Sequence, residues 1–358
     1  MEKYKMLGLM SGTALDGLDL ACCHIWENEG NWAFEIVEKA SIPYTSEMQN
    51  RLNGAIHLSA ENLLQFHNTY GTWLGEQAKS FISENRLNVD YIASHGHTTH
   101  HRPELGLTFQ IGSGQHLANA SGHKVICDFR TNDVALGGQG APLVPIGDSL
   151  FFNTYDFCLN LGGISNISFE IKGKRIAYDI GMANMLLNYI TRKIGLDYDE
   201  NGKKASSGKL NPKMLQQLND LEYYLLPHPK STGYEWFREK VIPIVERTND
   251  TIENLLHTSI HHICEKIAQQ IALNPIKEKQ RMLVTGGGAF NGFLIETLGQ
   301  KLGSHTQVIV PDKTIIAYKE ALIFALMGVL RMEKRTNVLS SVTGAKRNSS
   351  SGILFLPN

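Results

Sequence analysis

The chain has 358 residues, 42% hydrophobic and 19% charged, which is typical of a globular protein and long enough for about two domains. A formal net charge of −1 provides no general surface for nucleic acid or membrane. No apolar run reaches transmembrane length and no signal-peptide core precedes the first turn, so we expect a cytoplasmic protein.

The first predicted element is a β-hairpin at 7–26, where two apolar runs flank the turn MSGTALDGLD. Asp-Gly is the commonest pair at a hairpin turn, so packing alone accounts for the pattern. Alternatively, Gly and hydroxyl residues let backbone N–H groups approach a phosphate, and aspartate can hold the metal ion of that phosphate. The residues of this stretch leave both interpretations open.

Strand-like and helix-like segments then alternate along the chain, which predicts an α/β fold. Buried strands are expected in VDYIASHG, GHKVICDF and RMLVTGG, and helices at 61–85, 183–195, 211–225, 251–273 and in KEALIFALMGVLRM. The turn-rich tail SSVTGAKRNSSSGILFLPN is predicted to be an irregular surface segment.

The strand–turn–strand form of the first hairpin recurs at 155–171, and KGKRIAYD continues it as a third strand. This recurrence predicts a duplicated domain, with an N-terminal copy at 1–150 and a C-terminal copy at 151–358. We expect the two turns to face each other across a cleft, because ligands of open α/β sheets gather at strand ends. A third Gly-rich turn, at 285–288, follows another predicted strand.

Two standard nucleotide motifs are excluded. GKKASSGKL is not a P-loop, because its spacing from Gly202 is one residue too long and Leu210 replaces Ser or Thr. The turn at 286–288 is not a dinucleotide fingerprint, because Asn291 stands where the third Gly is required.

Four histidines lie in SHGHTTHHRP: His95, His97, His100 and His101. Metal binding, polar contacts to a substrate and ordinary core or surface histidines are all open for this run. No nearby Cys or acid completes a metal shell, and the five scattered cysteines show no CxxC spacing, so we expect no protein-built metal cluster.

Three further stretches carry charges beside predicted strand ends or helix starts. Asp128, Arg130 and Asp133 surround a Gly-rich bend, where Arg suits a carboxylate or phosphate and an Asp–Arg pair equally suits loop fixation. Asp179 follows an apolar strand before a helix, as a general base or a cap does. Glu320 enters an apolar helix, either as a partner of the helix dipole or as a site acid.

The sequence resembles the anhydro-N-acetylmuramic acid kinases, bacterial enzymes of cell-wall recycling. The resembling segments run nearly end to end and in family order: MSGTALDGLD, SHGHTTHHRP, DFRTNDVALGGQGAPLVP, LNLGGISNIS, PKSTGYEWF, TGGGAFNGFL, KEALIFAL and SVTGA. The resemblance implies two duplicated actin/hexokinase-like (ribonuclease H-like) domains around a central cleft, with ATP and Mg²⁺ as cofactors.

The resemblance also assigns roles by position. The residues implied to contact ATP are Gly12, Thr13, Ala14, Leu15, Asp16, Gly17, Leu18, Asp19, Gly162, Gly163, Gly286, Gly287 and Gly288. Those expected to bind the sugar are His95, His97, Arg130 and Asp133, and those expected to be catalytic are Asp179 and Glu320. The expected partners are a small-molecule sugar and ATP, and a homodimer is left open.

The implied reaction is an unusual phosphotransfer to an alcohol oxygen. Water attacks C1 of 1,6-anhydro-N-acetylmuramic acid while O6 takes the γ-phosphoryl group, giving N-acetylmuramic acid 6-phosphate. Asp179 is implied as the base that deprotonates the water, as in inverting glycosidases. Glu320 is expected to assist at the sugar or in the metal shell, and Arg130 to hold the lactyl carboxylate or a phosphate.

The sequence departs from the family pattern at a few positions. Ala14 replaces Ser, His97 replaces Gln, and Ile180, Met182 and Ala183 replace Thr, Pro and Gly around Asp179. These changes leave two alternatives: a plain sugar kinase of the same fold that acts on a free hydroxyl, and a nucleotide-dependent binding protein with impaired catalysis.

Overall fold

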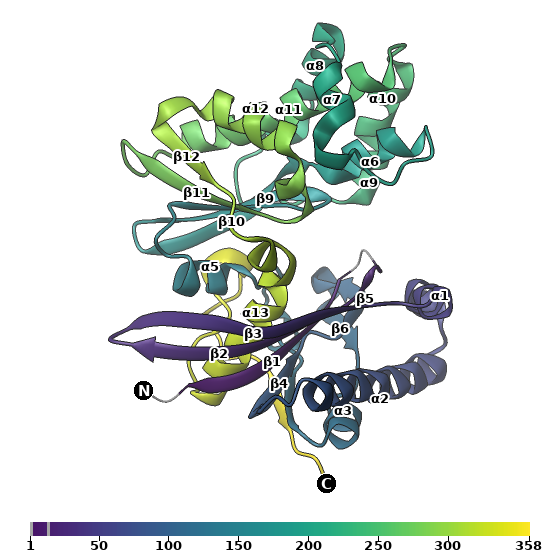
Figure 1. The fold of residues 1–358 in the computed structure, drawn as a ribbon, viewed down its shortest axis with the longest axis vertical. Helices are drawn as coiled ribbons and strands as arrows, with labels where there is room; N and C mark the ends of the chain where they lie inside the picture. Colours follow the sequence, from purple (N-terminus) through teal and green to yellow (C-terminus); the bar gives the residue numbers. More distant parts are fainter. Residues whose placement is uncertain (1–2, 13–14) are drawn as a thin grey trace. The chain divides into compact units, whose positions relative to one another are not determined.

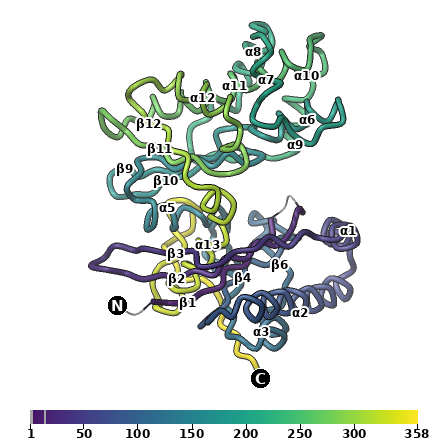
Figure 2. The backbone as a smooth tube through the Cα atoms, viewed as in Figure 1, coloured from purple at the N-terminus to yellow at the C-terminus, as the bar shows by residue number. Residues whose placement is uncertain are grey.

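The structure is a computed structural model that describes residues 3–12 and 15–358, so the predicted phosphate-turn residues Thr13 and Ala14 lie outside the described residues. Two compact units form, one from Met1–Phe151 with Tyr318–Asn358 and the other from Phe152–Ala317. Figure 1 labels their elements and Figure 2 traces the backbone.

The first unit is built on a sheet with the order β13-β7-β4-β1-β2-β3, and β5 and β6 form a separate two-stranded sheet. Its strands are β1 (Tyr4–Ser11), β2 (Gly17–Asn28), β3 (Asn31–Pro43), β4 (Tyr91–Ser94), β5 (His97–Arg102), β6 (Leu107–Ile111), β7 (Lys124–Cys127) and β13 (Ile353–Phe355). Its helices are α1 (Ser46–Gly54), α2 (Ala60–Glu84), α3 (Gly114–Ser121), α4 (Thr131–Ala135), α5 (Pro145–Phe151), most of α13 (Lys313–Met332) and α14 (Ser340–Thr343), with short 3-10 turns at Ala55–His57 and Pro103–Leu105.

Strand β1 is covered on one face by α2 and on the other by α13, and successive residues of the strand face these helices in turn. Leu7 and Leu9 lie in the buried cluster that includes Phe66, Tyr70 and other residues of α2. Gly8 points to the opposite face, where an added Cβ would lie 1.9 Å from the carbonyl oxygen of Ala321 on α13. Gly8 therefore allows the backbone of α13 to approach the sheet closely.

The same packing explains why the units divide the chain differently from the domains 1–150 and 151–358 expected from the sequence. The segment 318–358 belongs to the first unit. The α13 residue Gly328 sits against Met6 and Ala93 of the first sheet, and β13 pairs antiparallel with β7. The tail was expected to be irregular, and instead it contains α14 and β13.

The second unit is built on a sheet with the order β10-β9-β8-β11-β12. Its strands are β8 (Phe157–Leu161), β9 (Ile164–Ile171), β10 (Lys174–Met182), β11 (Gln280–Thr285) and β12 (Thr306–Ile309). Its helices are α6 (Asn184–Arg192), α7 (Lys203–Ser207), α8 (Pro212–Asn219), α9 (Tyr234–Trp236), α10 (Ile242–Arg247), α11 (Ile252–Leu273) and α12 (Gly292–Leu302), with 3-10 turns at Glu200–Gly202, Glu222–Leu225, Gly287–Phe290 and Gly303–His305 and a π-helical turn at Phe237–Val241.

One face of this second sheet is covered by helices, and Figure 1 shows α6, α11 and α12 on the same side of it. Phe157, Leu159 and Leu161 of β8 share a buried cluster with Leu256 and Ile260 of α11. The helix α11 has a Thr251 cap whose side chain accepts from the backbone N–H of Asn254, so the predicted helix at 251–273 is confirmed.

Apart from β13 at the edge of the first sheet, the two sheets have the same topology. In each, a first strand pairs antiparallel with a second and parallel with a fourth, and the second pairs antiparallel with a third. A fifth strand lies parallel beside the fourth in both sheets. This repeated order 3-2-1-4-5 confirms the predicted α/β fold of two duplicated ribonuclease H-like domains.

All five cysteines are buried free thiols. Over the described ranges 3–12 and 15–358, no helix combines the length and the apolar character needed to cross a bilayer.

Candidate active site

The predicted phosphate turn of the first unit connects β1 to β2. Gly17 begins β2 where an added Cβ would lie 2.5 Å from the carbonyl oxygen of Ile42, so the close approach of β3 requires glycine there. Leu15 has a φ of 59°, and its carbonyl accepts from the side-chain amide of Gln49 on α1 at 2.9 Å. Leu15 and Gly17 are therefore held from the side of α1 and β3.

The acidic residues of this turn differ in their surroundings. Asp16 is exposed, and its carboxylate accepts from the backbone N–H of Gly17 at 3.0 Å. Asp19 is half-buried on β2 and accepts from the Ser41 hydroxyl; burial raises the pKa of Asp19, with a smaller effect from Asp16 in the same direction. Leu18, expected to face ATP, is a core residue, so only its backbone is available to a ligand.

Beneath the turn lies a buried chain of hydrogen bonds that starts at Ser11. The Tyr44 hydroxyl donates to the Ser11 hydroxyl at 2.7 Å and lies 2.8 Å from the Tyr70 hydroxyl. Ser11 in turn lies 2.9 Å from Nδ1 of His97. Burial lowers the pKa of His97 to about 4, so the ring is neutral at pH 7. His97 therefore supports the last residue of β1, and its contact with a sugar stays a prediction.

A second polar group surrounds Arg130. Its guanidinium donates to Nε2 of His95 and, at 2.6 Å, to the carbonyl of Gly140. Burial lowers the pKa of Arg130 to about 10, which leaves the side chain protonated at neutral pH. Glu320 is accessible to solvent, yet the surrounding protein restricts its hydration and raises its pKa, while Arg130 and Lys319 oppose that shift.

The carboxylate of Asp133, a predicted sugar contact, bonds to two groups of the protein. The side chain is fully buried and accepts from the backbone N–H of Gly140 at 2.8 Å and from the Thr343 hydroxyl at 2.7 Å. An added Cβ on Gly138 would lie 2.2 Å from this carboxylate. Asp133 therefore fixes the Gly-rich bend that also receives Arg130.

In the second unit, two Gly-rich turns lie side by side at the ends of the parallel strands β8 and β11. Gly286 has a φ of 80°, and an added Cβ there would lie 2.6 Å from Asn160 Oδ1. Gly288 packs on Leu161, at 2.6 Å from a built Cβ. Gly287 differs, because the nearest atom to its built Cβ is Asn184 Nδ2 at 3.6 Å. Gly286 and Gly288 are therefore required by the fold, whereas Gly287 borders open space.

The turn at Gly162 and Gly163 is attached to the start of α6. The carbonyl of Gly162 accepts from the backbone N–H of Asn184, and that of Gly163 accepts from Ala183 and Met185. The Asn184 side chain donates to the carbonyl of Leu161 at 3.0 Å. These bonds fix the β8–β9 turn against the helix that follows β10.

Asp179 lies on the edge strand β10 at an irregularity in the ladder. Asp179 pairs with Asn166 and Gly181 with Ser165, so Ile180 is a bulged residue. Tyr178 and Ile180 both belong to the buried cluster, and the intervening Asp179 is half-buried. Burial raises the pKa of Asp179, and the Thr232 backbone N–H, which donates to the carboxylate at 3.1 Å, partly opposes the rise.

The three residues that depart from the family pattern beside Asp179 are core residues. Ile180 is 1% exposed, Met182 2% and Ala183 0%. Ile180 and Met182 pack in the same buried cluster as the strands and helices of the second unit. Their replacement of Thr and Pro is therefore a change in packing beneath the strand.

The partners of Asp179 and the ion pair beside Glu320 were not predicted from the sequence. Tyr223, Lys230 and Thr232 all bond to Asp179, and PKSTGYEWF, which includes two of them, was the only signal. Lys319 and Asp148 form a buried ion pair at 2.7 Å that joins α13 to α5. Neither set was predictable, because each joins residues distant in the sequence.

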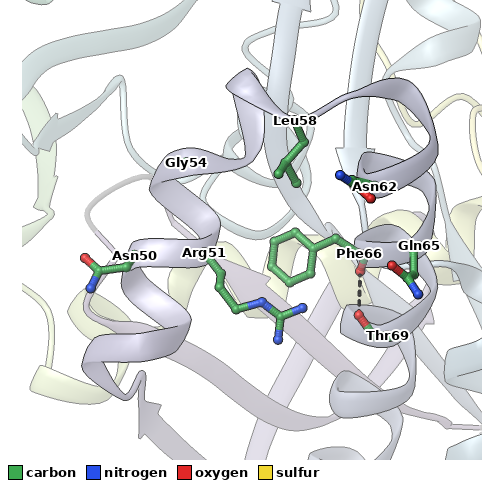
Figure 3. A pocket seen from close by; sticks show the side chains of 8 residues that line it. All are labelled: Asn50, Arg51, Gly54, Leu58, Asn62, Gln65, Phe66 and Thr69. Atoms are coloured by element: carbon green, nitrogen blue, oxygen red, sulfur yellow. Dashed lines mark hydrogen bonds between the residues drawn. The ribbon is translucent and has the colours of Figure 1, made fainter.

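An open hollow of about 470 Å³ lies between α1 and α2 (Figure 3). It is lined by Asn50, Arg51, Gly54, Leu58, Asn62, Gln65, Phe66 and Thr69, and Arg51 covers the Phe66 ring at 4.4 Å. Among the described residues, none of the predicted site residues lines this hollow. Within residues 3–12 and 15–358, no group of three or more His, Cys, Asp or Glu side chains is arranged to hold a metal ion.

Comparison with known proteins gives the family. The profile of the family described as anhydro-N-acetylmuramic acid kinase matches residues 4–357. Proteins with that name are 33% identical in Sulfurimonas denitrificans, covering 98% of each chain, and 33% identical in Aliivibrio fischeri, covering all of both chains. The Haemophilus influenzae protein of that name is 31% identical and covers 99% of this chain and 98% of its own.

A solved structure, the activator of the 2-hydroxyisocaproyl-CoA dehydratase from Clostridium difficile with bound ADPNP, is more distant. It is 12% identical and covers 92% of this chain and 97% of its own, with a TM-score of 0.44. That likeness is too weak to bear on function, whereas the sequence matches extend over nearly the whole chain. The chain belongs to the anhydro-N-acetylmuramic acid kinase family.

Proposed function

We propose that this protein uses ATP and water to convert 1,6-anhydro-N-acetylmuramic acid into N-acetylmuramic acid 6-phosphate and ADP. The substrate has no free 6-hydroxyl, because O6 is bonded to C1. Water must therefore add to C1 as the C1–O6 bond breaks, and O6 must take the γ-phosphoryl group. The observation that carries this proposal is the carboxylate of Asp179, held in a fixed position in a chain of this family.

Asp179 is suited to accept the proton of the attacking water. A carboxylate is a base of adequate strength at an anomeric carbon, as in inverting glycosidases. Restricted hydration raises the pKa of Asp179, which makes the ionised carboxylate a stronger base than an exposed aspartate. The Thr232 N–H bond fixes one carboxylate oxygen and leaves the other for a water molecule.

ATP fits the Gly-rich turns of the second unit. Gly287 borders open space that a side chain would fill, while Gly286 and Gly288 hold the turn backbone in place. Backbone N–H groups in such turns bind phosphate oxygens without the bulk of a side chain. We assign Gly286, Gly287 and Gly288 to the nucleotide and the turn at Gly162 and Gly163 to its phosphates. The turn from Gly12 to Asp19 is assigned to the phosphates as well.

The carboxylates of Asp16 and Asp19 fit a magnesium ion that arrives with ATP. Mg²⁺ prefers oxygen ligands and is commonly held by one or two carboxylates together with substrate phosphates. Asp16 is exposed and Asp19 half-buried, so both have oxygen atoms within reach of solvent. When bound, the ion neutralises charge on the phosphates.

Arg130 and Glu320 are assigned to the sugar side. A guanidinium recognises a carboxylate through paired N–H donors, and the lactyl group of the substrate supplies a carboxylate. His95 and Gly140 hold Arg130, which reduces the entropy lost when it binds an anion. We assign Glu320 to a proton or hydrogen-bond exchange with the sugar or to the metal shell, and its raised pKa supports the first of these roles.

The test is a single-turnover reaction of the purified protein with ATP and the anhydro-sugar, in which ADP and phosphosugar are both quantified. The proposal predicts equal amounts of the two products and loss of both when EDTA removes Mg²⁺. Phosphorylation of N-acetylmuramic acid but not of its anhydro form would instead indicate a plain sugar kinase. ATP binding without either product would indicate a nucleotide-dependent binding protein.

A further inference from the structure

Asp179 lies on an exposed edge of the second sheet, yet its backbone is fully engaged. Strand β10 is the outermost strand, so its outer N–H and C=O groups have no neighbouring strand. The Asp179 N–H donates to the carbonyl of Lys230 at 3.1 Å. The Asp179 carbonyl accepts from the Tyr223 hydroxyl at 2.7 Å. One segment, 223–232, thus provides both partners.

The same segment also binds the side chain. The backbone N–H of Thr232 donates to the Asp179 carboxylate at 3.1 Å. The segment therefore holds the N–H, the carbonyl and the carboxylate of a single residue. We call Tyr223, Lys230 and Thr232 together the Asp179 clamp.

The clamp is braced internally by Lys230. Its ammonium group donates to the backbone carbonyl of Tyr223 at 3.2 Å and lies 4.8 Å from the centre of the Tyr223 ring. These contacts close the loop between the two ends of the segment. They join Lys230, whose backbone carbonyl accepts from the Asp179 N–H, to Tyr223, whose hydroxyl donates to the Asp179 carbonyl.

The clamp is also anchored to the core through the next residue, Tyr224. Its hydroxyl lies 2.9 Å from Nε2 of His262, whose Nδ1 lies 2.7 Å from the side-chain oxygen of Asn219. An added Cβ on Gly181 would lie 2.6 Å from the Tyr224 ring, so glycine at this position lets Tyr224 pack directly on β10. The bulge at Ile180 lies between the clamped residue and this packing contact.

We propose that Tyr223 and Lys230 are positioning residues, which act through the backbone of Asp179 to aim its carboxylate at the attacking water. This inference rests on the proposed role of Asp179 as the base. A bulge disrupts the ladder of hydrogen bonds and bends the strand locally, and a misplacement of about 1 Å can cost roughly 10²-fold in rate. A clamp that holds both backbone groups of Asp179 supplies, beside the bulge, hydrogen bonds on the edge that no neighbouring strand covers.

The alternative is that the segment only covers a sheet edge. An edge cover would affect stability, and it would affect kcat only as far as the fold is disturbed. A positioning clamp would affect kcat and leave both KM values close to those of the parent protein, because neither Tyr223 nor Lys230 is assigned a contact with ATP or the sugar.

The experiment compares Tyr223→Phe, which removes one hydroxyl, with Tyr189→Phe as a matched control. Tyr189 lies on α6, where its hydroxyl donates to Glu246 on the surface of the same unit. For Tyr223→Phe we expect kcat to fall about tenfold or more, both KM values to stay within about twofold, and the far-UV spectrum to be retained. Tyr189→Phe should keep the parent kcat.

A second pair of variants covers the possibility that one substitution disturbs folding. Lys230→Met removes the ammonium group and should lower kcat, whereas Lys230→Arg keeps a cation near the Tyr223 carbonyl and should restore part of it. Parent-like kcat in both Tyr223→Phe and Lys230→Met would overturn the clamp. A loss of kcat matched by a rise in both KM values and a lower melting temperature would also overturn it, in favour of an edge cover.

Asp179→Asn separates failure of the clamp from failure of the proposed function. If Asp179→Asn abolishes turnover while Tyr223→Phe is fully active, the base assignment stands and the clamp is wrong. If Asp179→Asn turns over at near the parent rate, the base assignment itself is wrong, and the clamp has no catalytic group to position.

Discussion

Arg130 donates two hydrogen bonds to one nitrogen of His95, from Nε at 3.0 Å and from Nη2 at 2.8 Å to the same Nε2. Nε2 therefore accepts and carries no proton, and Nδ1 is left to donate to the carbonyl of Gly96 at 2.9 Å. Burial, with Arg130 second, lowers the pKa of His95 well below its usual range. The neutral imidazole is thus an acceptor that orients the guanidinium.

The first prediction follows from this pair. His95→Phe keeps a ring but removes the acceptor, and loss of a hydrogen bond to a charged group costs about 1.5–3 kcal/mol. If Arg130 binds the lactyl carboxylate, KM for the sugar should rise roughly tenfold or more, with KM for ATP nearly unchanged. His95→Gln retains an acceptor and should recover part of the loss. An unchanged sugar KM in His95→Phe would remove Arg130 from the sugar site.

The second prediction concerns acid stability. His95, His97 and His262 are buried, and burial lowers their pKa values, to about 4 for His97 and about 3 for His262. Unfolded histidines titrate near 6.5, so on acidification the unfolded chain takes up protons that the folded chain does not. Their contribution to stability is therefore complete above pH 6.5 and is lost as the pH falls.

For three such groups, the free energy of unfolding should fall by roughly 3 kcal/mol between pH 6 and pH 5. The carboxyls of Asp19, Asp179 and Glu320, whose pKa values are raised, act in the opposite sense as they protonate. Urea titrations across this range measure the slope, and His262→Gln should reduce it by about a third. A slope that His262→Gln leaves unchanged would show that His262 becomes protonated in the folded protein.

The third prediction separates binding from folding in the turn 286–288. Gly287→Val enters open space, so the melting temperature should change little while affinity for ATP falls about tenfold or more. Gly286→Ala meets Asn160 with a φ of 80° and should lower the melting temperature instead. Calorimetric titration beside a melting curve measures both effects. Parent-like ATP affinity in Gly287→Val would mean that the nucleotide does not approach this turn.

The fourth prediction tests the structural role of Asp133. Asp133→Ala leaves the Gly140 N–H and the Thr343 hydroxyl without their acceptor, which should lower the free energy of unfolding by about 2–4 kcal/mol. Asp133→Asn keeps one oxygen and should lose less. If Asp133→Ala unfolds like the parent protein but binds the sugar poorly, the carboxylate contacts the ligand after all.

Local patterns in the sequence were sufficient to predict the elements that hold the candidate site. The strand–turn–strand segments at 7–26 and 155–171 are the hairpins β1–β2 and β8–β9, and they begin sheets that share the order 3-2-1-4-5. The Gly-rich turn after β11 was also predicted, because alternating apolar residues and glycine are local signals. The residue roles assigned through the family resemblance remain predictions.

Long-range contacts could not be predicted in the same way. The structural role of Asp133 was not predicted, because its carboxylate accepts a hydrogen bond from Thr343, which lies more than 200 residues further along the chain. The clamp joins Asp179 to Tyr223 and Thr232 across 44 and 53 residues. The segment 318–358 packs in the first unit through close contacts at Gly8 and Gly328. Glycine has no side chain, so these two positions add nothing to the hydrophobic pattern of the sequence.

The most direct test of the proposed mechanism is reaction of the anhydro-sugar with ATP in ¹⁸O-labelled water. Water attack at C1 predicts label in the C1 hydroxyl and none in the ester oxygen, which is the former bridge oxygen. Asp179→Asn should reduce labelled product and ADP together, by roughly 10²-fold or more, with ATP affinity nearly unchanged. Label in the transferred phosphate, or bond opening by Asp179→Asn at near the parent rate, would contradict the account.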